Sequence, residues 1–176
     1  MYNILVVDDE YSIRSILKEA FEDDCYNIKL AESGEEALDI IKENDLDLVI
    51  TDLVMEEIDG IEVMEKGKDI QENIGFIIIT AYGTIKTAVN ALKKGAYDFI
   101  TKPFSVSHIK SRVDRFFEYK GLKKENKELK RKLSYDTKYN QIVGKSDAMK
   151  EIYNKIDLVS ESDAPVFLQG ESGTGK

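Results

Sequence analysis

Short hydrophobic runs alternate with amphipathic segments from residue 3 to beyond residue 105. Runs of this length, ended by polar residues, are typical of strands buried on both faces of a sheet. We expect strands at residues 3–7, 27–31, 47–51, 75–79 and 97–101. Between them, apolar residues recur at the spacing of an amphipathic helix. We expect helices at residues 12–21, 33–43, 60–70 and 84–94, and a last one from about Ser105.

Polar residues and a glycine mark where some of these helices begin and end. Ser12 and Ser33 stand at the start of two of them and are candidate N-caps. Gly95 follows the fourth helix, where glycine commonly ends a helix. The alternation of strand and helix predicts an α/β fold with a doubly wound, five-stranded parallel sheet.

Polar side chains follow four of the expected strands. Asp8 and Asp9 follow the first, Asp52 the third, Thr80 the fourth and Lys102 the fifth. In such a sheet, ligands bind at the carboxyl ends of the strands, so these residues are the candidate site. Three carboxylates in a low-dielectric cleft repel one another and need a cation. All-oxygen ligation favours Mg²⁺, which takes one or two protein carboxylates directly and keeps several waters.

The same residues suit phosphoryl transfer. The carboxylate of Asp52 can attack phosphorus and form an aspartyl phosphate. The ammonium group of Lys102 offsets the negative charge, and the hydroxyl of Thr80 can donate to a phosphoryl oxygen. Such catalysis depends on positioning and charge stabilisation.

Charge is unevenly distributed along the chain, whose formal net charge is −9. Acidic residues outnumber basic ones in residues 1–104, and the balance reverses in residues 105–176. An acidic first part argues against nucleic-acid binding there. The change of sign is the first indication of a domain boundary.

The sequence has no apolar run long enough to span a membrane. We expect Cys25 to be a reduced structural thiol in a cytoplasmic protein.

The last helix is expected to continue beyond Phe116. Leu122, Asn126, Leu129 and Leu133 follow one another at intervals of four, three and four residues, which is heptad spacing. Two heptads are short for a coiled coil. A solvated helical linker is therefore an alternative to a dimerising one. Asn126 favours the dimer, because a buried Asn at a core position tends to select a paired register.

Residues 1–119 closely resemble the receiver domains of response regulators in two-component systems, which have a CheY-like fold. The residues that carry this resemblance are Asp8-Asp9, Asp52 within TDLVM, Thr80-Ala81, and Lys102-Pro103 within FITKPF.

This resemblance implies a role for each site residue. Asp52 is then the phosphoacceptor, and a sensor histidine kinase is the partner that supplies the phosphoryl group. Asp9, Asp52 and the backbone carbonyl of Val54 would bind Mg²⁺, with Asp8 acting directly or through water.

Thr80 and Lys102 would hold the phosphoryl group. Phe99 occupies the position of the family's aromatic switch residue, and a core phenylalanine is the alternative reading. One departure is that Glu56 stands after Met55, where the family often has proline.

A second set of motifs lies in residues 140–176. IVGKSDAMKEI precedes APVFLQGESGTGK, whose end has the G-x-x-x-x-G-K pattern of a phosphate-binding loop after a strand. The residues of this loop are Gly170, Gly173, Gly175 and Lys176. The segment resembles the start of the AAA+ ATPase domain of sigma-54-dependent activators of the nitrogen-regulatory (NtrC) type.

Together the resemblances divide the chain into a receiver domain at 1–119, a helical linker at 120–139 and an N-terminal fragment of an AAA+ domain at 140–176. We expect the chain to be the first part of a larger activator and not itself an enzyme. The parent would be an ATPase that uses ATP, contacts sigma-54 RNA polymerase and DNA, and has no membrane partner. Phosphorylation of Asp52 would release or assemble its ATPase ring, and the linker helix would form a homodimer.

Other functions fit the residues less well. In a flavin-binding module of the same sheet order, Asp8, Asp9 and Glu10 would repel the flavin phosphate. A haloacid-dehalogenase-type phosphatase needs a second aspartate two residues after the acceptor, where Val54 stands. By the receiver resemblance, Val54 and Tyr82 flank the path of a hydrolytic water. These two side chains predict slow hydrolysis of the aspartyl phosphate. The alternative is that both point to solvent and change the rate little.

Overall fold

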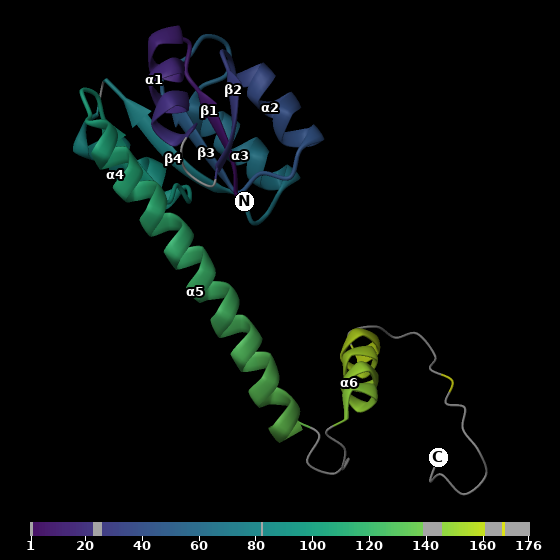
Figure 1. Ribbon diagram of the computed structural model, residues 1–176. Coiled ribbons are helices and arrows are strands. Elements are labelled where there is room, and N and C mark those ends of the chain that lie inside the picture. Colours follow the sequence, from purple (N-terminus) through teal and green to yellow (C-terminus); the bar gives the residue numbers. More distant parts are fainter. Residues whose placement is uncertain (1, 23–25, 82, 139–145, 161–166, 168–176) are drawn as a thin grey trace, which may run out of the picture. The chain divides into compact units, whose positions relative to one another are not determined.

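The computed structural model describes residues 2–22, 26–81, 83–138, 146–160 and 167 (Figure 1). The strands are β1 (Tyr2–Val7), β2 (Tyr26–Ala31), β3 (Leu48–Asp52), β4 (Gly75–Thr80) and β5 (Asp98–Thr101). The helices are α1 (Tyr11–Glu22), α2 (Gly34–Glu43), α3 (Gly60–Ile70), α4 (Ile85–Lys93), α5 (Val106–Lys138) and α6 (Asp147–Ser160). The hydrophobic pattern therefore located the elements of residues 2–101 correctly, because each strand is a compact apolar run.

The five strands form one parallel sheet in the order β2-β1-β3-β4-β5. The predicted fold class is confirmed, since this is the flavodoxin-like order of a doubly wound sheet. The winding reverses between β1 and β3, which are neighbours, and Val7 pairs with Thr51 there. Asp8 and Asp52 each come one residue after this pair, so the register brings the two carboxylates to the same point of the sheet edge.

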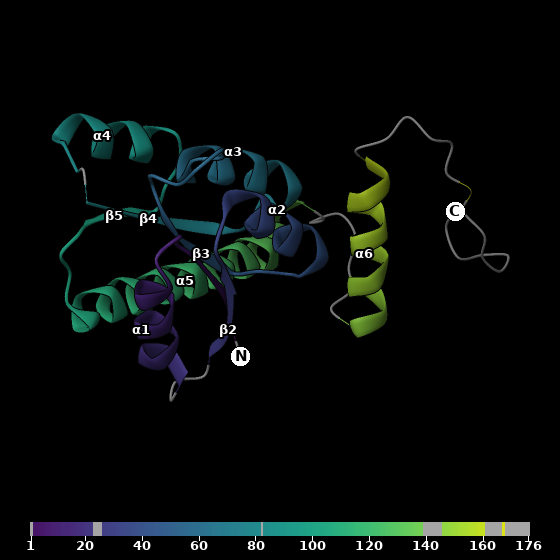
Figure 2. The same ribbon diagram turned by 90° about the horizontal axis from the view of Figure 1, so that it is seen from above.

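Helices cover both faces of the sheet (Figure 2). Alternate strand residues point to opposite faces. One face packs against α2, α3 and α4 and includes Leu5, Val7, Val49, Phe76 and Ile78. The other packs against α1 and α5 and includes Ile4, Val6, Leu48, Ile50, Ile77 and Ile79. Since the central strands are buried on both sides, their ends at the sheet edge have little freedom to move.

The start of α1 differs from the expectation. The helix begins at Tyr11, and the carbonyl of Glu10 accepts a hydrogen bond from the N–H of Ile13 at 3.1 Å. Ser12 therefore lies inside the helix, and the expected N-cap at Ser12 is wrong. The N-cap at Ser33 is confirmed, because its hydroxyl accepts a backbone N–H from the first turn of α2.

The first half of α5 packs on the sheet through four buried side chains: Ile109, Val113, Phe116 and Phe117. Phe117 stacks on Tyr2, with ring centroids 4.0 Å apart. Lys120 Nζ lies 2.6 Å from Asp47 Oδ1. Lys120 is also the last residue of the first compact unit, residues 1–120, and residues 121–176 form the second. Of the described helices, none is long and apolar enough to cross a bilayer.

Gly60 tests how tightly the end of β3 is held. A Cβ on Gly60 would lie 2.1 Å from the backbone oxygen of Asp52. We predict that Gly60→Ala lowers the free energy of unfolding by about 1–3 kcal/mol, the usual cost of overpacking. Urea denaturation measures this loss. The control is Gly121→Ala in α5, where a Cβ meets nothing within 4 Å. A Gly60→Ala variant as stable as the control would contradict the packing.

Candidate metal and phosphoryl site

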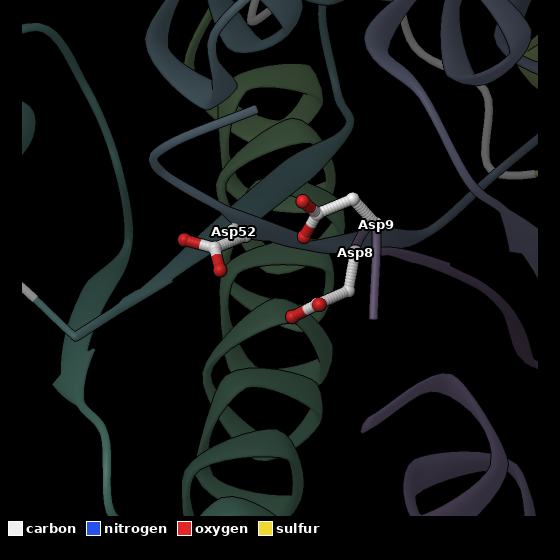
Figure 3. Close-up of side chains that lie close together, drawn as sticks. All are labelled: Asp8, Asp9 and Asp52. Atoms are coloured by element: carbon white, nitrogen blue, oxygen red, sulfur yellow. The ribbon is translucent and has the colours of Figure 1, made fainter. Parts of the chain in front are cut away.

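Three carboxylates meet at the carboxyl edge of the sheet (Figure 3). One carboxylate oxygen from each of Asp8, Asp9 and Asp52 lies within 4.8 Å of the other two. Asp8 is 1% exposed and Asp52 is 7% exposed, whereas Asp9 is exposed. The structure therefore brings together the three aspartates that the sequence singled out, two of them at buried positions.

Lys102 supplies the positive charge nearest to this cluster among the described residues. Its Nζ lies 2.8 Å from Asp8 Oδ2 and 2.5 Å from Asp52 Oδ2. A third carboxylate, that of Glu10, lies 3.5 Å from the same nitrogen. Burial alone would lower the pKa of Lys102, but its hydrogen bonds to Asp52 and Asp8 outweigh burial and raise the pKa above its usual range. Lys102 is therefore a permanent cation at this site.

The Asp8 carboxyl shows that one lysine does not neutralise the site. Burial is the largest influence on Asp8 and raises its pKa. Hydrogen bonds from Lys102 and from the N–H of Glu10 lower it, yet the net pKa stays above the ordinary value. The charge deficit follows from the groups present, since three carboxylates of the cluster face one bonded ammonium. A divalent cation bound by carboxylate oxygens fits this need, so the residues present suit Mg²⁺.

Backbone hydrogen bonds hold the strand end that carries Asp52. The N–H of Val54 donates to Asp52 Oδ1 at 3.1 Å, and the hydroxyl of Thr51 donates to the Asp52 carbonyl at 2.9 Å. The N–H of Leu53 donates to the carbonyl of Ile79 on β4 at 2.7 Å. These bonds leave Asp52 Oδ2 directed at Lys102. The Val54 side chain, which the sequence placed beside the path of water, is 53% exposed.

Thr80 lies on β4, the neighbour of β3, and Phe99 lies on β5, the next strand beyond it. Thr80 is fully buried at the end of β4 and pairs with Thr101 on β5. Phe99 is partly buried and packs against the core on the α2–α3–α4 face. One edge of its ring lies 3.2 Å from where a Cβ on Gly83 would stand. The Phe99 ring thus contacts both the core and the loop after Thr80. This position fits a switch residue as well as a core phenylalanine.

Some predicted residues lie outside the described part of the chain. They are Tyr82 and the phosphate-loop residues Gly170, Gly173, Gly175 and Lys176. Sequence reasoning also missed one residue of this region, Arg14. Its guanidinium contacts the backbone of Asp8 and Asp9. The only signal in the sequence was an arginine one turn into the helix that follows the acidic pair.

Two family models match the chain. Residues 4–114 match the response regulator receiver domain, and residues 142–176 match the Sigma-54 interaction domain. Regulatory protein AtoC of Escherichia coli (strain K12) is 35% identical over 98% of this chain and 38% of its own length. The chain therefore spans less than half the length of this curated relative.

Solved structures agree with these matches. The solution structure of the beryllofluoride-activated NtrC4 receiver domain dimer has 38% identity and a TM-score of 0.64, over 68% of this chain and 98% of that one. The CheX-CheY-BeF3-Mg+2 complex from Borrelia burgdorferi has 32% identity and a TM-score of 0.63, over 66% of this chain and 89% of that one.

The chain belongs to the response regulator receiver family. The second match is confined to residues 142–176 and is to the Sigma-54 interaction domain. The family resemblance seen in the sequence is confirmed.

Lys102 offers a test of the charge balance at this site. We predict that Lys102→Met lowers the free energy of unfolding by about 1–3 kcal/mol at pH 7 without metal, because buried Asp8 loses its ionic partner. The pKa of Asp8, already raised by burial, rises further in the variant. Its folded state then binds a proton at mildly acidic pH that its unfolded state does not bind. The stability gap to the wild type therefore narrows as the pH falls toward 5.

Urea denaturation in EDTA at pH 7 and pH 5.5 measures this gap. The control is Lys42→Met, which removes an exposed ion pair with Asp39. We expect the control to change stability by less than about 0.5 kcal/mol at either pH. A gap for Lys102→Met that widens in acid would refute the charge balance described here.

Proposed function

We propose that Asp52 accepts a phosphoryl group from a sensor histidine kinase. An Asp52 carboxylate oxygen attacks phosphorus, and the bond between phosphorus and the donor histidine nitrogen breaks, with its electron pair going to that nitrogen. The observation that carries this proposal is the position of Lys102 Nζ, in contact with both Asp52 and Asp8. Lys102 offsets the repulsion between the acceptor carboxylate and the incoming anion. Thr80 would donate its hydroxyl to a phosphoryl oxygen, and Phe99 would respond to this change as the switch residue.

The proposed metal ligands are Asp8, Asp9, Asp52 and the backbone carbonyl of Val54. The shared edge position of the three aspartates, with a single bonded ammonium beside them, supports this assignment. The Borrelia complex similar to this chain contains Mg²⁺. When bound, Mg²⁺ would neutralise charge on the reacting oxygens. The protein groups around the acceptor hold it in place.

For the whole protein, we propose the division into receiver at 1–119, linker at 120–139 and AAA+ start at 140–176. The match of residues 142–176 to the Sigma-54 interaction domain supports it. The loop from Gly170 to Lys176 would bind ATP phosphates, and the parent would act on sigma-54 RNA polymerase at DNA. The receiver part would then regulate this ATPase through the phosphorylation state of Asp52.

A homodimer through the linker helix is the proposed assembly. Tyr119, Leu122 and Leu129 are 54%, 66% and 49% exposed in the single chain. With Asn126 they occupy successive core positions of a heptad repeat. Such an apolar row on an otherwise charged helix is suited to pairing with a second copy. The NtrC4 receiver domain, similar to this one, was solved as a dimer.

Charges beside this row favour a parallel pair. Glu118 and Glu125 immediately precede core positions, and Lys123 and Lys130 immediately follow them. In a parallel dimer, each of these glutamates faces the lysine five residues later on the other copy. In an antiparallel dimer, like charges would face each other. The sequence of the helix therefore suits two parallel copies in register.

Phosphorylation of Asp52 has a direct test. Incubation with acetyl phosphate or phosphoramidate and Mg²⁺ should add the mass of one phosphoryl group to the intact protein. Asp52→Ala should show none, whereas Asp39→Ala, which changes an exposed carboxylate on α2, should react like the wild type. An adduct that persists undiminished in Asp52→Ala would overturn the assignment of the acceptor.

The dimer is tested by exchanging charges along the seam. We expect light scattering to give a dimer for the full chain and a monomer for a version that ends at Lys120. Glu118→Lys with Glu125→Lys should be monomeric, as should Lys123→Glu with Lys130→Glu, because like charges then meet across the helices. Mixing the two variants should restore dimers. Two variants that remain dimeric alone, or a monomeric wild type, would reject the parallel pair.

A further inference from the structure

Arg14 is the most deeply buried arginine among the described residues, and neither the sequence motifs nor the proposed chemistry uses it. It lies in the first turn of α1 and is 9% exposed. Arginine is rarely buried to this degree unless its guanidinium is fully occupied by partners. The identity of those partners therefore indicates what the side chain does.

The principal partners are backbone groups of the acidic pair. Arg14 Nη1 donates to the carbonyl of Asp8 at 2.6 Å and to the carbonyl of Asp9 at 3.0 Å. Nη2 lies 3.4 Å from Glu32 Oε2, and the Glu32 side chain is 74% exposed. An exposed ion pair contributes little to stability. The contact with Glu32 thus does not account for the burial of Arg14, whereas the two carbonyls do.

Two bonded carbonyls restrain the backbone that carries the Asp8 and Asp9 side chains. Each peptide unit is planar, so holding a carbonyl limits the rotation of the adjoining backbone. The N–H of Glu10 also donates to Asp8 Oδ1 at 3.0 Å, and the N–H of Asp8 donates to the carbonyl of Ala31 at 3.2 Å. The Asp9 residue is exposed, and it is held through its backbone. The Asp9 carbonyl accepts a hydrogen bond from Arg14 on α1 at 3.0 Å.

We propose that Arg14 is a positioning residue that preforms the metal site by holding the backbone of Asp8 and Asp9. This inference rests on the proposed Mg²⁺ site at those residues. Its guanidinium also places a positive charge beside the acidic pair without occupying the carboxylates, in contrast to Lys102, which bonds two of them directly. Residues that orient metal ligands in this way typically affect metal affinity by 10–100-fold.

The test is Mg²⁺ titration of the full chain by calorimetry. Arg14→Met keeps the length of the side chain but removes its charge and donors. We expect its dissociation constant for Mg²⁺ to rise by roughly ten-fold. Arg14→Lys, which restores a charge and donors, should recover part of the affinity. Glu32→Gln, which removes only the exposed ion pair, should stay within about two-fold of the wild type.

Different outcomes separate this inference from the function on which it rests. Failure of the wild type to bind Mg²⁺, or unchanged binding in Asp9→Ala, would overturn the metal site itself. A wild type that binds, with Arg14→Met folded and equal to it in affinity, would overturn the role of Arg14 alone. If Arg14→Met does not fold, Arg14→Gln replaces it under the same criterion. Unfolding of both neutral variants would assign Arg14 to stability and reject the positioning role.

Discussion

Mutual repulsion of three carboxylates at one edge of a sheet is the constraint on which the rest of this structure depends. Asp8 and Asp52 are buried beside each other, where charges interact more strongly than in water. The fold offsets this cost with a shared ammonium from Lys102 and with backbone N–H groups directed at carboxylate oxygens. The compensation is incomplete, because one ammonium faces three carboxylates, and burial raises the pKa of Asp8. An apo site that still lacks positive charge is one that favours binding a divalent cation.

The sheet provides the rigidity that keeps this unfavourable cluster assembled. The strands that end at Asp8 and Asp52 are neighbours in register and are buried on both faces. Gly60 packs directly against the backbone carbonyl of Asp52, and the space between them is too small for a Cβ. The carboxylates consequently cannot separate without disrupting the core. The stability of the two apolar layers thus supports a site that is locally destabilising.

Sequence reasoning succeeded where side-chain pattern determines structure. Apolar runs located the strands, and the rule that ligands bind at strand ends selected Asp8, Asp9, Asp52 and Lys102, which the structure brings together. It failed where hydrogen bonds to backbone groups determine the local structure. Helix α1 begins at Tyr11, where the carbonyl of Glu10 accepts the first backbone N–H bonds, so the hydroxyl of Ser12 misled the assignment. The contacts of Arg14 are also to carbonyls, which are present at every residue and so leave no pattern to read.

Helix α5 gives the site a structural connection to the proposed dimer seam. It begins at Val106, four residues after Lys102, and runs back across the sheet to Lys120, which is paired with Asp47 just before β3. About fifteen helical residues span roughly 22 Å, comparable to the length of a six-residue strand. The helix thus crosses from the carboxyl edge of the sheet to the opposite edge, and the exposed row begins there, at Tyr119. A packed helix moves largely as one rod, so the packed part of α5 is the element that would carry a shift near Lys102 to Tyr119.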